Sequence, residues 1–222
     1  MKKRTQYKVP NETHLKNDWL VQKLAPDFEL LDVWEYPICF KTDEGDTLYK
    51  FRKYAIEPTL KNAFNFSITG ALFYFRAIIG KIFRLDKDVN KLPIPDCKEI
   101  SLAERMNETE KSQHSSKLDI EIRTDKFLDF RTVYSLEDET VNEISNATEH
   151  TLMHYAWVKS ENNCYKIQMA TYIKHRNRMG AFYIKLISPF RYWIVYPYLF
   201  TGYIRCWNEY KMTNVQCEKM NE

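Results

Sequence analysis

Two histidines four residues apart, His150 and His154, have the type and spacing of a possible chemical site. Histidines at positions i and i+4 of a helix share one face and can bind zinc, and the zinc-protease pattern places Glu directly after the first His. Here Thr151 follows His150, and Glu149 precedes it. The segment alternates in polarity like a strand, where four residues span about 13 Å, which is too far for one shared ion. We therefore predict no metal site, and we predict no cofactor.

Strand periodicity places a set of residues around these histidines on one face of a predicted sheet. The set mixes small, apolar and imidazole side chains, which suits a ligand pocket with a few fixed polar contacts. Its members are Ile144, Asn146, Thr148, His150, Leu152, His154 and Ala156, and the opposite face carries Glu143, Ala147, Met153, Tyr155 and Trp157. Imidazole titrates near neutral pH, so His150 or His154 could serve as the general base of a cyclase or hydratase. The alternative is that Asn146 and His150 only satisfy backbone groups at a strand bend.

Aromatic and cationic residues further along the chain add a second group of pocket candidates. Arg191 could form a buried ion pair or a ligand clamp with Glu143, or stabilise negative charge in a reaction. Tyr183, Trp193 and Tyr196 could line a cavity, or they could pack in the core as most aromatic residues do. The full set of ligand-pocket candidates is Asn146, Thr148, His150, His154, Tyr183, Arg191, Trp193 and Tyr196. The sequence assigns no catalytic residue.

Several classes of function have no motif in this chain. There is no Gly-x-Ser-x-Gly elbow, no Gly-rich phosphate loop and no G-x-G-x-x-G fingerprint. The net charge is only +3, and the one tight basic run is Lys2, Lys3 and Arg4, so we predict no nucleic-acid binding. The content of 44% hydrophobic and 28% charged residues is that of a globular protein.

The cysteines and the N-terminus indicate a compartment. The five cysteines are widely scattered and form no C-x-x-C pair, so we predict that they are reduced. They are Cys39, Cys97, Cys164, Cys206 and Cys217. The basic start of the chain is not followed by an apolar signal segment, which predicts a cytoplasmic location.

The elements that must position these residues begin with strands. We predict a strand at 27–40 and a short one at 47–54. From Lys117 the period of the pattern falls to two, and this predicts strands near 117–124, 127–135, 139–146, 147–158 and 163–174. Turn signals at Leu136–Asp138 and Ser160–Asn163 join strands too tightly for parallel crossovers, so the strands form an antiparallel meander.

Helices are predicted from apolar residues spaced three or four apart. Segment 59–85 has this spacing and reads as one helix or two. Ser101 followed by Glu104 matches a capping box and predicts a short helix at 101–108, whereas the polar stretch 107–116 reads as a mobile loop.

The last predicted element is a long helix from about 178 to 210, which Pro189 and Pro197 should kink. Its uncharged run from Tyr192 to Ile204 is thirteen residues long, shorter than the roughly 20 apolar residues of a membrane span. We predict a packing helix and no transmembrane span. Peripheral membrane contact by the aromatic run 192–204 stays open.

Two groups of residues resemble a bacterial family of unknown function in the START/polyketide-cyclase-like (SRPBCC, helix-grip) superfamily. The first is Glu143, Asn146, Thr148, His150, His154 and Trp157, and the second is Gly180, Tyr183, Pro189, Phe190, Arg191, Tyr196 and Pro197. The similarity is strongest over about 126–207, with a weaker match at 72–86. The resemblance implies an α+β helix-grip fold, in which a curved antiparallel sheet wraps around a long kinked C-terminal helix, with an N-terminal helix pair and an internal cavity.

Together these patterns predict a single domain over residues 1–222 with a flexible insert near 107–116. The predicted function is the binding of a small hydrophobic ligand in a cavity between the sheet and the C-terminal helix. One alternative is a cyclase or hydratase that uses a pocket histidine, and another is a membrane-surface or protein-interaction module. The sequence predicts neither the ligand nor the oligomeric state.

Overall fold

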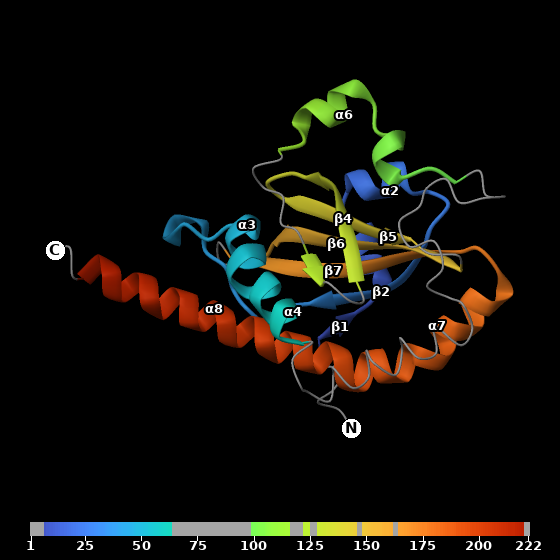
Figure 1. Ribbon diagram of the computed structural model, residues 1–222. Coiled ribbons are helices and arrows are strands. Elements are labelled where there is room, and N and C mark those ends of the chain that lie inside the picture. The colour runs from blue at the N-terminus through green and yellow to red at the C-terminus, as the bar shows by residue number, and fades with distance from the viewer. Residues whose placement is uncertain are drawn as a thin grey trace.

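The computed structural model describes residues 7–63, 99–115, 122–124, 128–145, 148–161 and 164–219. The fold is α+β, with a curved antiparallel sheet and a long C-terminal helix that runs across one face of it (Figure 1). The predicted α+β class, with a curved antiparallel sheet and a long C-terminal helix, is therefore confirmed. We call the face covered by the C-terminal helix the inner face and the opposite one the outer face.

Within the described residues, one sheet contains seven strands in the order β1-β2-β7-β6-β5-β4-β3, and every neighbouring pair is antiparallel. The strands are β1 (Lys8–Val9), β2 (Glu29–Glu35), β3 (Ile122–Thr124), β4 (Leu128–Ser135), β5 (Glu139–Ser145), β6 (Glu149–Lys159) and β7 (Tyr165–His175). The meander predicted from Lys117 onward is confirmed. The strand predicted at 27–40 ends earlier, at Glu35, and Phe40 then makes an isolated bridge to Tyr165.

Short helices form the first part of the chain. They are α1 (Asn11–Leu15), α2 (Leu20–Leu24), α3 (Leu48–Phe51), the π-helical turn η2 (Arg52–Ile56) and α4 (Glu57–Ala63). The prediction of a strand at 47–54 is wrong, because α3 and η2 occupy this segment. The Thr47 side chain caps α3 by accepting from the Lys50 backbone N–H, and Leu48, Phe51 and Ala55 then bury one helical face.

Of the segment 59–85, which was predicted to be helical, the structure describes only the part up to Ala63, and this part belongs to α4. Its remainder, including the weaker family match at 72–86, lies outside the described residues.

The segment after Glu99 also differs from its prediction. Ser101 caps only a 3₁₀ turn, η3 (Leu102–Arg105). The complete capping box forms later, between Asn107 and Glu110, and it begins helix α6 (Glu108–Gln113) where a loop was predicted. Two reciprocal hydrogen bonds at one helix start explain why a polar, exposed stretch is helical.

The predicted long C-terminal helix is confirmed, and a wider turn interrupts it. Helix α7 (Arg178–Phe190) continues through the π-helical turn η5 (Arg191–Val195) into α8 (Tyr196–Lys219). The turn lies between Pro189 and Pro197, where proline removes an internal hydrogen bond and its ring crowds the preceding turn. Figure 1 shows the helix changing direction in this region. Among the described helices, none has the length and apolar character needed to cross a membrane.

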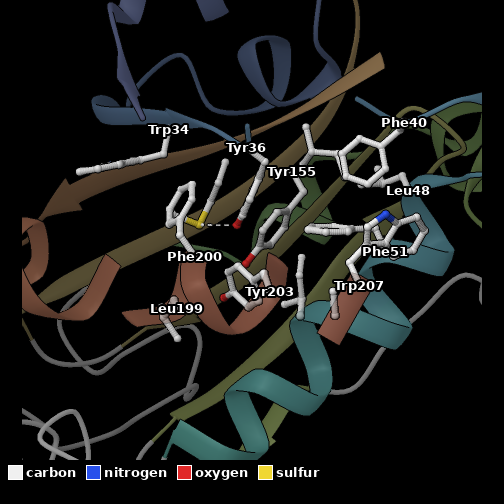
Figure 2. Packing of buried hydrophobic residues seen from close by; sticks show 14 of the residues in the cluster. Trp34, Tyr36, Phe40, Leu48, Phe51, Tyr155, Leu199, Phe200, Tyr203 and Trp207 are labelled. Carbon is white, nitrogen blue, oxygen red and sulfur yellow. Dashed lines mark hydrogen bonds between the residues drawn. The ribbon is translucent and has the colours of Figure 1, made fainter. Parts of the chain in front are cut away.

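Both faces of the sheet are buried. On the inner face α3, η2 and α8 pack an aromatic cluster on β2, β6 and β7, which we call the inner aromatic cluster (Figure 2). Its aromatic members are Trp34, Tyr36, Phe40, Phe51, Tyr155, Tyr196, Phe200, Tyr203 and Trp207. On the outer face α1, α2 and residues 99–106 cover apolar side chains of β2 and β4–β7. The rings of Tyr36 and Phe200 stack at 4.5 Å, which is typical of a filled interior.

Cys39 and Cys164 form a disulfide, so the prediction that all cysteines are reduced is wrong. Their Cα atoms lie 5.3 Å apart although 125 residues separate them in the sequence. The bond lies next to the bridge of Phe40 to Tyr165, where the segment after β2 meets the start of β7. Disulfides are typical of oxidising compartments, so this one does not support the predicted cytoplasmic location.

Cutting this cross-link should destabilise the protein. A disulfide that closes a loop this long restricts the unfolded chain, and we expect the Cys39→Ser/Cys164→Ser variant to lose about 2–4 kcal/mol of unfolding free energy. Denaturant titration under non-reducing conditions measures the loss. The matched control is Cys206→Ser, which removes a free thiol and should change stability little. Equal stability of the wild type with and without reductant would contradict the prediction.

Candidate functional site

The predicted pocket residues divide between the two faces of the sheet. Strand parity holds along β6, where His150, Leu152, His154 and Ala156 share the outer face. Tyr183 and Tyr196 are instead buried on the inner face, where Tyr183 packs on Ile173. The histidines and the C-terminal helix therefore do not line one cavity.

Three other candidates lie elsewhere. Thr148 is buried just before β6, and its carbonyl accepts from the backbone N–H of Arg176. The Trp193 side chain is 53% exposed on the solvent side of η5. Asn146 lies outside the described residues.

His150 is fully buried on the outer face between two carboxylates. Its Nδ1 lies 3.0 Å from Glu99 Oε1, and its Nε2 lies 3.0 Å from Glu143 Oε2. Because both partners are acceptors, both ring nitrogens donate, so the ring is an imidazolium. Burial lowers the pKa of His150, but the hydrogen bonds that its ring donates to Glu143 and Glu99 outweigh burial and raise the pKa above its ordinary value.

The two glutamates fix residues 99–106 onto the sheet. Glu143 accepts from the backbone N–H of Leu102 at 3.0 Å and from the Ser101 hydroxyl. Glu99 accepts from Nε of Arg176 at 2.9 Å. Burial raises the pKa of Glu99, but the bond from His150 and the charge of Arg176 lower it, to about 2 overall. These residues thus hold a segment with little secondary structure against the outer face.

A second buried chain of hydrogen bonds includes His154 and His14. Gln168 Oε1 lies 2.9 Å from His14 Nδ1, His14 Nε2 lies 3.1 Å from His154 Nδ1, and His154 Nε2 lies 2.9 Å from Glu139 Oε2. The amide of Gln168 donates to Glu35, which leaves its oxygen for His14. Both ends of this chain are therefore acceptors, so His14 Nδ1 and His154 Nε2 each carry a proton. A third proton lies between His14 Nε2 and His154 Nδ1. Because two neutral rings carry only two protons, one of the rings is an imidazolium.

The location of that charge follows from burial and position. Burial, followed by the charge of His154, lowers the pKa of His14 from 6.5 to about 3. His14 is therefore neutral, and the positive charge lies on His154 beside Glu139. Glu139 also accepts from Tyr134 at 2.8 Å and from the backbone N–H of Leu20 at 2.8 Å, which attaches α2 to the sheet.

Neither imidazole has the geometry of a general base. Both rings are fully buried, and both nitrogens of each ring bond to side chains. The predicted cyclase or hydratase role of His150 or His154 therefore gains no support from the geometry. Among the described residues, no group of three or more His, Cys, Asp or Glu side chains is arranged to hold a metal ion.

The inner face carries a separate polar group around Asp32, which we call the inner polar cluster and define as Asp32, Thr171, Arg191, Tyr192 and Tyr196. Arg191 Nη2 donates to Asp32 Oδ2 at 3.1 Å and also contacts the Tyr196 hydroxyl. Tyr192 donates to Asp32 Oδ2 at 3.1 Å, and the Trp34 indole donates to Oδ1 at 3.0 Å. The predicted pair of Arg191 with Glu143 is wrong, because Glu143 lies on the outer face.

The inner polar cluster lies between two apolar groups. The inner aromatic cluster is on the α8 side, and Ile173, Tyr183 and Ile184 are on the α7 side. Arg191 is the first residue of η5, and π-helical turns occur often at functional sites. Nη1 of Arg191 is buried and has no hydrogen-bond partner among the described residues. Such a donor is the kind of group that a ligand or an ordered water satisfies.

Comparison with known proteins adds one finding. A family model described as "Protein of unknown function (DUF2867)" matches residues 24–198. No curated protein and no solved structure matches the chain. The matched range contains β2, the meander, α7 and η5, and therefore Asp32, Arg191 and both histidines of β6.

Removing the buried imidazolium should destabilise the fold. His150→Gln leaves Glu99 and Glu143 without their shared cation, and we expect a loss of about 3–5 kcal/mol in unfolding free energy. Urea denaturation at pH 6 measures the loss. His175→Gln, at the partly exposed end of β7, is the matched control and should cost less than about 1 kcal/mol. Equal losses in the two variants would refute the structural role of His150.

The same groups predict how stability depends on pH. The folded pKa of His150 is raised, so its contribution is full below about 6.5 and is lost as the pH rises through the folded value. The folded pKa of Glu99 is about 2, so its contribution is full above 4.5 and is lost as the pH falls toward 2. The folded pKa of His14 is lowered to about 3, so this residue lowers the stability as the pH falls below 6.5. We therefore expect the unfolding free energy to be greatest near pH 6.5. The decline on the alkaline side should be smaller in His150→Gln, as a series of urea titrations would show.

Proposed function

We propose that this chain, which belongs to the DUF2867 family of proteins of unknown function, binds a small, neutral and largely apolar molecule beside the inner polar cluster. The observation that carries the proposal is the buried, unpartnered Nη1 of Arg191. A buried donor left without an acceptor costs about 1–3 kcal/mol. A ligand oxygen that accepts from Nη1 recovers this free energy, and the ligand is therefore held by its one polar group.

The charge balance of the site favours a neutral ligand. Asp32 is fully buried and forms an ion pair with Arg191, so the two charges already compensate each other. A ligand carboxylate would add a buried charge without a counterion, which is strongly unfavourable. A carbonyl, ester or ether oxygen accepts the same hydrogen bond without that cost.

The surroundings of the site favour an apolar body. Tyr196 and Trp34 pack edge to face at 4.7 Å on one side of the polar cluster, and Tyr183 packs with Ile173 on the other. Apolar walls with a few placed polar groups are the usual composition of small-molecule sites. In this proposal Tyr183, Arg191 and Tyr196 contact the ligand, whereas His150 and His154 stabilise the opposite face.

The order of the elements supports placing the chain in the helix-grip superfamily, and this placement is part of the proposal. An antiparallel meander followed by a long C-terminal helix is the arrangement that the superfamily resemblance implies. The ligand then lies between sheet and helix, as predicted from the sequence, and at the junction of α7 and α8 rather than against the histidines.

The proposal predicts that Arg191 recognises a ligand oxygen. A long-chain methyl ketone should bind the purified protein, and the alkane of equal length should bind at least about tenfold more weakly, because it cannot accept from Nη1. Arg191→Lys keeps the charge opposite Asp32 but presents no second nitrogen, so it should weaken ketone binding by a similar factor. Native mass spectrometry and thermal shift measure binding.

The matched control is Arg178→Lys, which changes an exposed arginine of the same helix and should leave ketone binding unchanged. The thermal midpoint of Arg191→Lys without ligand shows whether the variant folds. Equal binding of ketone and alkane, or no binding of either, would refute the proposal.

A further inference from the structure

The solvent side of α7 and η5 carries a row of large apolar side chains, which we call the exposed stripe. Its members are Met179 (48% exposed), Phe182 (60%), Leu186 (49%), Phe190 (45%) and Trp193 (53%). They follow one another at intervals of three or four residues, so they form one continuous helical face. Single exposed apolar residues are common in soluble proteins, but a continuous row of this size marks an interaction surface.

A different face of the same helix attaches α7 to the sheet. Gly180, Tyr183 and Ile184 are its buried residues. A Cβ atom at Gly180 would lie 2.6 Å from the carbonyl oxygen of Thr148, so the helix and the backbone before β6 are in direct contact there. Packing therefore uses one face of α7 and leaves the exposed stripe unused. Figure 1 places α7 along the outside of the molecule, away from the middle of the sheet.

The charged residues of α7 and η5 themselves have one sign. The sequence contains no Asp or Glu between Glu161 and Glu209. The same stretch contains the cations Lys166, Lys174, Arg176, Arg178, Lys185, Arg191 and Arg205. Several of them pair with carboxylates from other parts of the chain. Arg178 and Lys185 are exposed on α7 itself, and in the described part of the chain neither has a carboxylate partner.

Arg178 and Lys185 lie beside the stripe. They are seven residues apart, which is close to two helical turns, so they share one edge of the helix. At about 100° per residue this edge adjoins the face of Phe182 and Leu186 on the side away from Tyr183 and Ile184. The helix thus presents three faces, of which one is attached to the sheet, one is apolar and exposed, and one is cationic.

We propose that the exposed stripe is a docking surface for an anionic lipid membrane, with α7 and η5 lying in the plane of the interface. Helices that bind in this way combine Trp, Phe and Leu on one face with Lys and Arg on another. The apolar side chains enter the region between headgroups and acyl chains, and Arg178 and Lys185 contact lipid phosphates. Trp193 suits this depth, because its ring is apolar and its N–H can reach water or a headgroup.

Charge favours a lipid surface over a second copy of this chain. Two stripes packed face to face would bring the cations of both copies together, and α7 and η5 contain no carboxylate to pair with them. Lipid phosphates supply the missing negative charge. The surface is formed by residues 178–193, whereas much of the aromatic run 192–204 is buried, including Tyr196, Phe200 and Tyr203.

Co-sedimentation of the full chain with vesicles tests the proposal. The wild type should bind vesicles of phosphatidylcholine mixed with phosphatidylserine, bind phosphatidylcholine alone more weakly, and dissociate at high salt. Phe182→Gln/Trp193→Gln should lower the partition coefficient at least about tenfold, because two aromatic side chains no longer enter the interface. Arg178→Gln/Lys185→Gln should abolish the preference for anionic vesicles.

The matched control is Met212→Gln, which removes an equally exposed apolar side chain of α8 outside the stripe and should leave binding unchanged. Both double variants change exposed residues, and their thermal midpoints verify that they fold. Three results would overturn the proposal. They are no binding of the wild type to either vesicle, equal loss in the Met212→Gln control, and a wild-type dimer in sedimentation equilibrium that Phe182→Gln/Trp193→Gln dissociates.

Discussion

The alternation of side chains along β6 and β7 is the constraint on which the rest of this structure depends. Both strands are buried on both faces, so each residue faces either the aromatic layer under α8 or the polar network under α1 and α2. Tyr155 and His154 are neighbours in sequence, and yet one packs in the inner aromatic cluster while the other carries a buried charge. A slip of one residue in the pairing would exchange these environments for every side chain of the strand.

The outer face shows how charges are kept in a buried layer. Each imidazolium lies against at least one carboxylate, and each carboxylate also accepts from a backbone N–H, a hydroxyl or Arg176. Buried pairs of this kind add little net stability, because desolvation offsets their attraction. Their directional hydrogen bonds join α2 and residues 99–106 to particular strands. These short segments have few other directional contacts that would fix their position on the sheet. We interpret the network as a source of specificity in packing.

The sequence predicted the elements with a strong period and missed the contacts between distant parts of the chain. Side chains that alternate with a period of two predicted strands β4–β7, and apolar residues three or four apart predicted the C-terminal helix. The face of Glu143 was assigned wrongly because parity was counted through the turn between β5 and β6, where the chain reverses and Glu143 comes to lie beside His150. The contact of Glu139 with His154 could have been found, since the hairpin register pairs β5 with β6. His14 and Glu99 come from distant segments and have no local signal. The Asp32–Arg191 pair spans 159 residues and is equally invisible.

The disulfide has a consequence for how the chain responds to damage. Cys39 and Cys164 enclose β3–β6, together with α3, η2, α4 and residues 99–106, within one covalent ring. A protease that cuts once anywhere inside this ring opens it without releasing a fragment, because the two pieces stay joined through sulfur. The cut chain keeps β2 tethered to the start of β7, its neighbour in the sheet. The two fragments of a nicked chain therefore separate on a denaturing gel only after reduction.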